Sequence, residues 1–307
     1  MHDGRPVASL IILTYNQKDF IEQAILSALN QNASFEFEVI VADDCSVDGT
    51  WEKVSELACV YHFKKIRTSV NSGVVSNLNN AFNLAEGDYI FLMGGDDISH
   101  SERLSYLVEY FYKNLDTYCI YSNTFDMNFD GRVLTNKPSG YRYHLRNGDM
   151  TIKSFLENDL GVLGCSAAYR REVFVNFGDL NKGLPSEDKV LTLRALILGD
   201  VHYVSVPLVY YRLGVGVSNN TSIRSKYNYV KLLNGKLNTY KGYLNDGAVS
   251  AIQSEEILII KHYIDFFTMA LSLFQEFSIC EFFKLLVSRV NLREKARFLF
   301  YFLRLSK

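Results

Sequence analysis

The stretch GDYIFLMGGDD, residues 87–97, places a short apolar run directly before two glycines and two aspartates. Such a run, bounded by turn residues, is typical of a strand buried on both faces of a parallel sheet. The pattern occurs earlier in the chain, where FEVIVA at residues 37–42 precedes Asp43 and Asp44. Ligands of open α/β sheets bind outside the carboxyl ends of the strands. Both acidic pairs are therefore expected at one shared edge of a sheet.

The rest of the first two thirds of the chain alternates between strand and helix patterns with short connections. This alternation predicts an α/β fold with a mainly parallel, Rossmann-like sheet flanked by helices. Residues 125–164 lose the regularity and are rich in Asn, Gly, Asp and Tyr, as in loops that shape a binding surface. Two strands, residues 201–206 and 208–212, are expected on either side of Pro207, and only helices are predicted after about residue 218.

The composition is ordinary for a soluble protein, with 307 residues, 48% of them hydrophobic, and a net charge of −2. This length suits one large domain with an extension. Without a global basic field, no nucleic-acid partner is expected. Five scattered cysteines without a CxxC pair argue against a disulfide framework or a zinc site and favour a reducing compartment. We expect neither a signal peptide nor a membrane span of about 20 apolar residues.

The segment 281–307 carries a local excess of positive charge. Seven Lys or Arg residues face only Glu281 and Glu294, a net charge of +5, so the remainder of the chain carries −7. A basic amphipathic helix can lie on an anionic membrane surface. A helix that packs on the catalytic domain with its arginines in solvent would give the same pattern. The sequence leaves both interpretations open.

A third acidic pair, Glu187 and Asp188, follows Pro185 and precedes an apolar helix pattern. Clustered carboxylates repel one another unless a cation or a proton neutralises them. Three such pairs therefore suggest a divalent metal, a phosphorylated ligand or acid–base chemistry. The alternative is structural, since Ser, Asp and Glu also cap helix N-termini and would do so here.

The turn after the first strand contains Thr14, Tyr15 and Asn16 but no glycine. A GxGxxG motif and a P-loop are both absent, which disfavours nucleotide binding through a glycine-rich phosphate cradle. An aromatic ring and an amide could instead stack on and hydrogen-bond a base, or Tyr15 could simply cap the sheet edge. Asn71 and Gly73 could form a polar wall or an ordinary turn.

Taken together and in this order, several segments resemble family 2 glycosyltransferases, which have the A-type glycosyltransferase fold. The resemblance covers roughly residues 7–212, and its motifs are specific in combination but not singly. The segments that carry it are SLIILTYNQ (residues 9–17), VADDCSVDGT (41–50), NSGVVSNLNNAF (71–82), GDYIFLMGGDDISHSERL (87–104), SAAYRREVFVNFG (166–178) and SEDKVLTLRAL (186–196).

The resemblance implies a role for each matching position. Asp96 would bind Mg²⁺ or Mn²⁺ that bridges the diphosphate of a nucleotide-sugar, with Asp97 as its metal-site neighbour. Asp188 would be the general base on the acceptor hydroxyl, and Glu187 would shape the acceptor site. The implied donor site comprises Thr14, Tyr15, Asn16, Asp43, Asp44, Asn71, Gly73 and Asp96.

The chain departs from the family pattern at two informative places. Gly94 stands where the first acid of the D-x-D motif is usual, so Asp96 would carry more of the metal binding. The Q-x-x-R-W signature of processive synthases is absent, because the only tryptophan is Trp51. The resemblance implies addition of a single sugar rather than extrusion of a polymer.

The leading hypothesis is a metal-dependent inverting glycosyltransferase of surface polysaccharide biosynthesis. Its donor would be a nucleotide-sugar, with a UDP-sugar favoured, and its acceptor a glycan or a lipid-linked glycan. It would be cytoplasmic or peripheral on the inner face of the membrane, with contact through residues 281–307. The alternative is a non-catalytic nucleotide-sugar or glycan-binding protein of the same fold. A nucleotidyltransferase is disfavoured because TYNQ supplies no glycine-rich basic loop.

The expected domain organisation follows from the same resemblance and from the change to helices. Residues 1–215 would form the catalytic domain, with a nucleotide-sugar half at 1–125 and an acceptor half at 126–215. Residues 216–307 would form a helical extension.

Overall fold

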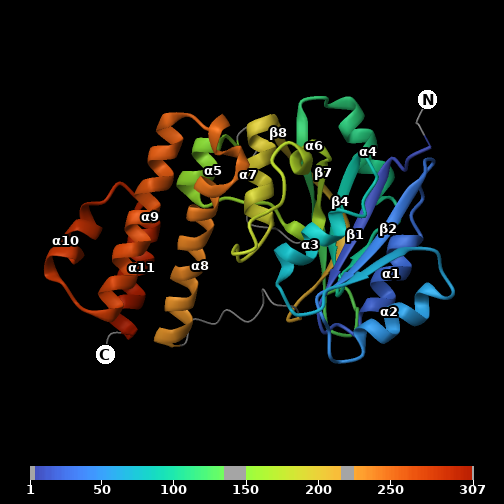
Figure 1. Ribbon diagram of the computed structural model, residues 1–307, viewed down its shortest axis with the longest axis horizontal. Helices are drawn as coiled ribbons and strands as arrows, with labels where there is room; N and C mark the ends of the chain where they lie inside the picture. The colour runs from blue at the N-terminus through green and yellow to red at the C-terminus, as the bar shows by residue number, and fades with distance from the viewer. Residues whose placement is uncertain (1–3, 135–149, 216–224, 306–307) are drawn as a thin grey trace.

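A computed structural model describes residues 4–134, 150–215 and 225–305 of the chain. Eight strands form one sheet flanked by helices, and four helices follow the last strand (Figure 1). The strands are β1 (Ala8–Thr14), β2 (Phe37–Asp43), β3 (Lys64–Arg67), β4 (Tyr89–Gly94), β5 (Ile98–Ser99), β6 (Thr117–Met127), β7 (Ala167–Arg170) and β8 (Asp200–Arg212).

The sheet is mixed, in the order β3-β2-β1-β4-β7-β6-β8-β5. Strands β1 to β4 are parallel to one another, and β6 is parallel to β8. Strand β7 lies antiparallel between β4 and β6, and β5 is an antiparallel edge strand. The α/β class with a Rossmann-like parallel half is confirmed, and the antiparallel strands join it to the second half.

The helices lie between and after these strands. They are α1 (Ile21–Leu29), α2 (Thr50–Ala58), α3 (Val74–Phe82), α4 (Arg103–Lys113), α5 (Ile152–Asn158), α6 (Glu172–Val175), α7 (Asp188–Leu198), α8 (Lys226–Asn245), α9 (Ser254–Gln275), α10 (Ile279–Val287) and α11 (Leu292–Leu305), with short 3₁₀ turns η1 (Gly164–Ser166) and η3 (Gly247–Ala251).

The central strand β1 is mostly apolar because helices cover both of its faces, and its two polar residues are Ser9 and Thr14. Its residues Leu10, Ile11 and Ile12 are fully buried, and alternate ones belong to two separate apolar clusters. In the parallel register Thr14 pairs with Asp43, and Leu13 pairs with Gly94. The carboxyl ends of β1, β2 and β4 therefore meet at one edge, as the sequence predicts.

The structure corrects the prediction of two strands around Pro207. Strand β8 continues through this proline, which pairs with Asn123 of β6 where the register shifts on both sides. A proline removes a ladder hydrogen bond and is tolerated at such irregularities. Strand β6 and α5 also extend into the region expected to be irregular, although residues 135–149 of that region lie outside the described residues.

Helices α8 to α11 pack together at the end of the molecule remote from β1 and β2, with α5 and α7 between them and the sheet (Figure 1). One apolar cluster runs from Ile11 of the sheet to Phe302 of α11, so these helices share a core with the sheet. By length and composition, α9 is the one helix among the described residues that could cross a membrane. It also buries Phe266 and Phe267 completely, as a core helix does.

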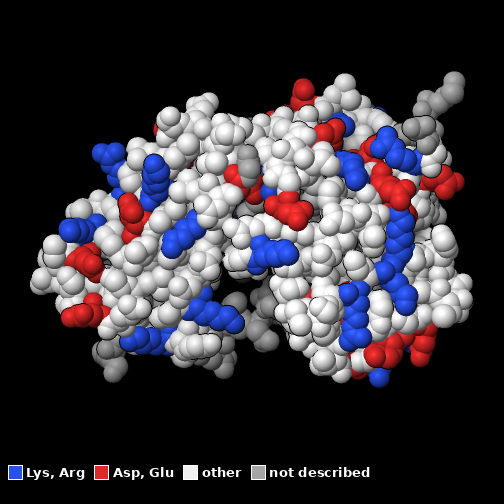
Figure 2. Space-filling model, in the orientation of Figure 1, with Lys and Arg blue, Asp and Glu red and all other residues white. Residues whose placement is uncertain are grey.

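Acidic and basic side chains are intermingled on the face shown in Figure 2, and neither sign forms a large continuous field there. This distribution agrees with the net charge of −2. Long-range electrostatic steering is therefore a weaker feature of this face than local pairing of charges.

Candidate active site

The two aspartates at the end of β2 are already engaged by protein groups. Asp44 accepts hydrogen bonds from the backbone N–H groups of Ser72 at 2.9 Å and Gly73 at 2.7 Å, and from the Thr68 hydroxyl at 3.0 Å. Asp43 is fully buried and pairs with Arg67 at 3.2 Å. These carboxylates fix the loop that precedes α3, and a glycine suits position 73 because its φ is +86°.

The turn after β1 is held against the turn after β2. The backbone N–H of Asn16 donates to Ser46 Oγ at 2.8 Å, and Asn16 Oδ1 accepts from the backbone N–H of Val47 at 2.9 Å. Asn16 adopts φ = 53°, a left-handed conformation that asparagine tolerates better than most residues. Tyr15, beside it, is partly exposed at the same edge. The turn is thus rigid without a glycine.

Asp96 lies in a tight polar corner beyond β4. It is largely buried, and burial raises the pKa of its carboxyl above the ordinary value even though the Gln17 side chain hydrogen-bonds to it. An added Cβ at Gly94 would stand 2.7 Å from Asp96 Oδ1, and one at Gly95 would stand 2.7 Å from Thr14 Oγ1. Both glycines are therefore required sterically, because any side chain there would displace the groups around Asp96.

Asp97 is buried behind Asp96 and is held from three sides. Its Oδ1 accepts from the backbone N–H of Arg212 at 3.0 Å, and the Cys165 thiol hydrogen-bonds to the carboxyl. Burial and the neighbouring Asp96 raise the pKa of Asp97 to about 8. The Arg103 guanidinium is fully buried nearby and offsets part of this effect. Asp97 is therefore enclosed by protein groups rather than facing solvent.

Glu187 and Asp188 mark the beginning of α7. Asp188 accepts from the Ser186 hydroxyl at 2.6 Å and from the backbone N–H of Lys189 at 2.8 Å. Burial and the adjacent Asp188 raise the pKa of Glu187 to about 7. Glu187 is the N-cap residue of α7 and its side chain makes no capping hydrogen bond, whereas the Asp188 carboxylate is held at the first helical position. Both residues are partly exposed.

The short turn η1 brings the two acidic regions into one neighbourhood. An added Cβ at Gly164 would stand 3.2 Å from Glu187 Oε1 and 3.6 Å from the Cβ of Asp188. The next residue, Cys165, hydrogen-bonds to Asp97. Consecutive residues of η1 therefore lie beside the acids of α7, at Gly164, and beside the acids after β4, at Cys165. The structure places Asp97 and Glu187 on two sides of a single three-residue turn.

The donor groups around Asp96 fit a hard divalent cation that also binds a substrate phosphate. Among the described residues, no group of three or more His, Cys, Asp and Glu side chains could enclose a metal. Mg²⁺ commonly uses only one or two protein carboxylates together with phosphate oxygens. Two buried oxygens beside Gly95, Thr14 Oγ1 and Gln17 Oε1, have no hydrogen-bond partner. Oxygen donors of this kind suit such an ion.

The donor-side residues predicted from the sequence do gather at one edge. Asn71 is an exposed part of the loop that Asp44 fixes, and the next two residues, Ser72 and Gly73, make the hydrogen bonds to that carboxylate. Several residues of the site do not stand out in the sequence. Gln17 stands in the TYNQ turn and could have been found there, whereas the others become evident only when distant strands pack: Gly164, Cys165, Arg103 and Arg212.

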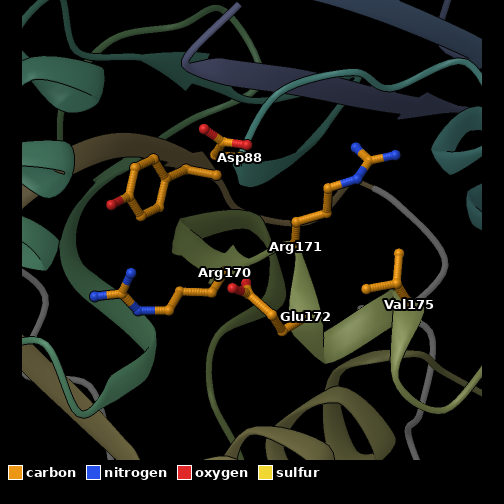
Figure 3. A pocket seen from close by; sticks show the side chains of 6 residues that line it. Asp88, Arg170, Arg171, Glu172 and Val175 are labelled. Carbon is orange, nitrogen blue, oxygen red and sulfur yellow. The ribbon is translucent and has the colours of Figure 1, made fainter. Parts of the chain in front are cut away.

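An open pocket of about 450 Å³ lies elsewhere, at the amino end of β4. Figure 3 shows Arg170 and Arg171 directed away from one another in it, with Asp88 and Glu172 nearby. Arg170 donates to the carbonyl of Thr117 at 2.7 Å, and Arg171 donates to a carbonyl of the chain after α3 at 2.8 Å. These guanidiniums satisfy backbone acceptors and support the sheet.

Residues 9–178 match the family model described as glycosyl transferase family 2. The chain belongs to this family. Family membership agrees with the resemblance seen in the motifs and with the acidic edge after β2 and β4.

Curated relatives of the family match parts of the chain. An uncharacterized protein of Mycobacterium tuberculosis is 26% identical over 66% of this chain and 58% of its own length. An abequosyltransferase of Salmonella typhimurium is 34% identical over 36% of this chain and 34% of its own. A putative teichuronic acid biosynthesis glycosyltransferase of Bacillus subtilis is 31% identical over 40% and 48%. The chain thus spans less than two thirds of the length of these relatives.

Solved structures share the fold over nearly the whole chain. TarS residues 1–349 of S. aureus, in complex with UDP-GlcNAc, gives a TM-score of 0.58 at 20% identity, covering 95% of this chain and 78% of TarS. A mannosyltransferase of Pyrobaculum calidifontis, in complex with GDP-Man and Mn²⁺, gives 0.56 at 14% identity, covering 92% and 79%. These similarities establish the glycosyltransferase A-type fold.

Proposed function

We propose that this chain is a metal-dependent inverting glycosyltransferase that moves one sugar from a nucleotide-sugar to a glycan or lipid-linked acceptor. The observation that carries this proposal is the turn η1, whose Gly164 lies beside Glu187 and whose Cys165 hydrogen-bonds to Asp97. A transferase needs its phosphate-binding and proton-accepting groups around one reaction centre. Related proteins named for surface glycans support a role in polysaccharide biosynthesis.

The donor would lie across the carboxyl ends of β1, β2 and β4. Tyr15 would stack on the base, while Asp43 and Asp44 would act mainly through the loop they hold. The remaining donor-side contacts would come from Thr14, Asn16, Asn71, Gly73 and Asp96. A UDP-sugar is the preferred candidate, because the similar TarS structures hold UDP or UDP-GlcNAc.

Asp96 would hold Mg²⁺ or Mn²⁺ together with the diphosphate, and Asp97 would keep Asp96 in place. A bound cation supplies charge stabilisation to the departing diphosphate. Asp188 would accept the proton of the acceptor hydroxyl, and Glu187 would line the acceptor side. A single displacement on the face opposite the leaving group inverts the anomeric centre. The proposed domain boundary, at about residue 215, places these groups within one catalytic unit.

A thermal-shift panel of UDP-, GDP- and dTDP-sugars with Mn²⁺ tests the donor site. We expect one nucleotide-sugar to raise the melting temperature in the wild type, and the Asp96→Ala variant to lose that response. Mn²⁺-dependent hydrolysis of the same donor should also be lost in this variant. Failure of every nucleotide-sugar to stabilise the wild type would refute the donor proposal.

Gly94 favours a second candidate, a non-catalytic nucleotide-sugar or glycan-binding protein of the same fold. Its position lacks the first acid of the usual D-x-D motif. Hydrolysis separates the two candidates, because a binding protein would be stabilised by the nucleotide-sugar without cleaving it.

The protein would act in the cytoplasm or at the inner face of the membrane, where residues 281–307 would contact the lipid.

A further inference from the structure

Helix α10 presents two different faces. Leu285 is fully buried, and Phe282 packs against Phe302 of α11 with ring centroids 6.0 Å apart. On the other face, Ile279, Phe283 and Val287 are 67%, 60% and 78% exposed. Their spacing of four residues puts them in one row along the helix. A row of large, solvent-exposed apolar side chains costs solubility and marks an interaction surface.

The exposed charges of the segment that carries this row have one sign, and two exposed acids border it. Glu276 lies just before the segment, and Asp265 lies in the pocket between α9 and α10. From Phe277 to Leu305, every exposed charged side chain is basic, and the two acids in the segment are at least partly buried. Glu281 takes a hydrogen bond from Ser272, and Glu294 pairs with Lys236 at 2.8 Å. The exposed basic residues are Lys284, Arg289, Arg293, Arg297 and Arg304.

Two of these basic residues flank a pocket of about 460 Å³ between α9 and α10. Lys284 and Arg289 line it together with Val287 of the apolar row. His262 and Asp265 of α9 line the opposite side. Neither Lys284 nor Arg289 forms an ion pair with another side chain of the described segments. Their charges remain available to an anion at the border of the apolar row.

We propose that α10 docks on an anionic lipid bilayer. The row of Ile279, Phe283 and Val287 enters the boundary between head groups and acyl chains, while Lys284 and Arg289 meet lipid phosphates at the pocket. An amphipathic helix binds a membrane in this way, through apolar burial plus attraction to anionic lipid. Membrane docking by α10 extends the proposed function. It rests on that function only in one respect, that docking would bring the protein close to a lipid-linked acceptor.

Charge complementarity favours this occupant over a second copy of the chain. A dimer formed by two α10 surfaces would place the same unpaired basic side chains against one another, and like charges in a contact disfavour it. Anionic lipid instead supplies negative charge opposite the basic side chains of α10 and its C-terminal end. The position of α10 at the end remote from β1 and β2 leaves the donor edge open when the helix is docked (Figure 1).

Sedimentation with sucrose-loaded vesicles tests the proposal on the full chain. We expect the wild type to pellet with vesicles of phosphatidylcholine and phosphatidylglycerol, to remain in solution with phosphatidylcholine alone, and to dissociate as salt is raised. Phe283→Glu and the double variant Lys284→Glu/Arg289→Glu should each reduce the bound fraction at least tenfold. The matched controls Leu115→Glu and Lys231→Glu, also at exposed positions, should bind like the wild type.

Three results would overturn the proposal. The first is that the wild type does not bind anionic vesicles. The second is that Phe283→Glu binds them as well as the wild type does. The third is that the wild type forms dimers in a concentration-dependent way and Phe283→Glu does not. Melting curves and Mn²⁺-dependent donor hydrolysis of Phe283→Glu should match the wild type, because the ring faces solvent. Failure of membrane docking and failure of the glycosyltransferase proposal are thus separate outcomes.

Discussion

The backbone N–H of Arg212 donates to Asp97 Oδ1 at 3.0 Å across 115 positions of sequence. The Arg212 guanidinium also donates to the carbonyl of Asp96 at 2.8 Å and to Gln23 Oε1 at 3.0 Å. The end of β8 therefore holds the side chain of Asp97 and the backbone of Asp96. These contacts join β8 to the acids that follow β4.

Replacement of Arg212 by methionine should destabilise the packing around Asp96 and Asp97. The buried carbonyl of Asp96 and the amide of Gln23 would lose their charged donor, which we expect to cost about 2–3 kcal/mol of unfolding free energy. Urea denaturation measures this loss, and Arg132→Met, at an exposed position, should stay within about 0.5 kcal/mol of the wild type. Equal stability of Arg212→Met and the wild type would show that the contact does not support the fold.

Gly94→Ala should damage the Asp96 site even though it adds only one methyl group. The new Cβ would stand 2.7 Å from Asp96 Oδ1 and 3.2 Å from Asp97 Oδ2, so the carboxylates must move. Overpacking of this kind costs about 1–3 kcal/mol. We expect the apparent affinity for Mn²⁺, measured by donor-dependent thermal shift, to fall about tenfold or more. Gly178→Ala, where an added Cβ has open space but φ is +73°, controls for backbone strain alone.

Glu187→Gln should change how stability depends on pH. The pKa of Glu187 is about 7 in the folded chain, compared with an ordinary value of 4.5. Between these values the unfolded chain releases the proton while the native chain keeps it, so wild-type stability falls as pH rises through the window. The variant lacks this loss. Because the side chain is partly exposed, we expect it to be more stable by about 1 kcal/mol at about pH 8.

The same comparison at about pH 4 should show little difference, since Glu187 is then protonated in both states. Melting temperatures across this range give the measurement. Glu172→Gln, at an exposed acid, should follow the wild-type curve throughout. A Glu187→Gln curve parallel to that of the wild type would contradict the raised pKa.

Asp246→Ala should destabilise the fold, because it breaks the ion pair between the end of α8 and α7. Asp246 follows α8 and pairs with Arg194 of α7 at 2.8 Å, and both side chains are almost completely buried. Removal of one partner leaves a buried charge, which costs about 3–5 kcal/mol. The matched pair Lys153–Glu255 joins α5 to α9 in solvent, so Glu255→Gln should cost less than about 1 kcal/mol. Similar losses for the two substitutions would contradict this difference.

Much of the donor edge could be predicted because its information is local. The apolar runs that form β1, β2 and β4 each precede polar residues, and parallel strands bring their carboxyl ends together. The positions of Asp43, Asp44 and Asp96 at this edge therefore follow from the sequence alone. It also identified the helices that follow, since their apolar residues recur at helical spacing.

The supporting residues could not be predicted because their roles depend on distant packing. Arg212 reaches the acids only through the pairing of β6 with β8, and Cys165 reaches Asp97 only through η1. The strand prediction was wrong at Pro207, because proline is disfavoured inside a strand on local grounds. The register shift between β6 and β8 accommodates this proline, and the local sequence does not indicate that shift. No local sequence pattern indicates that β7 lies antiparallel between β4 and β6.

Crystals of the full chain soaked with Mn²⁺ and UDP test the central claim most directly. The account predicts an anomalous manganese peak within coordination distance of the Asp96 carboxylate, with the UDP diphosphate on the same ion and η1 between this site and Asp188. A manganese peak away from Asp96, or UDP bound instead in the pocket of Arg170 and Arg171, would contradict it.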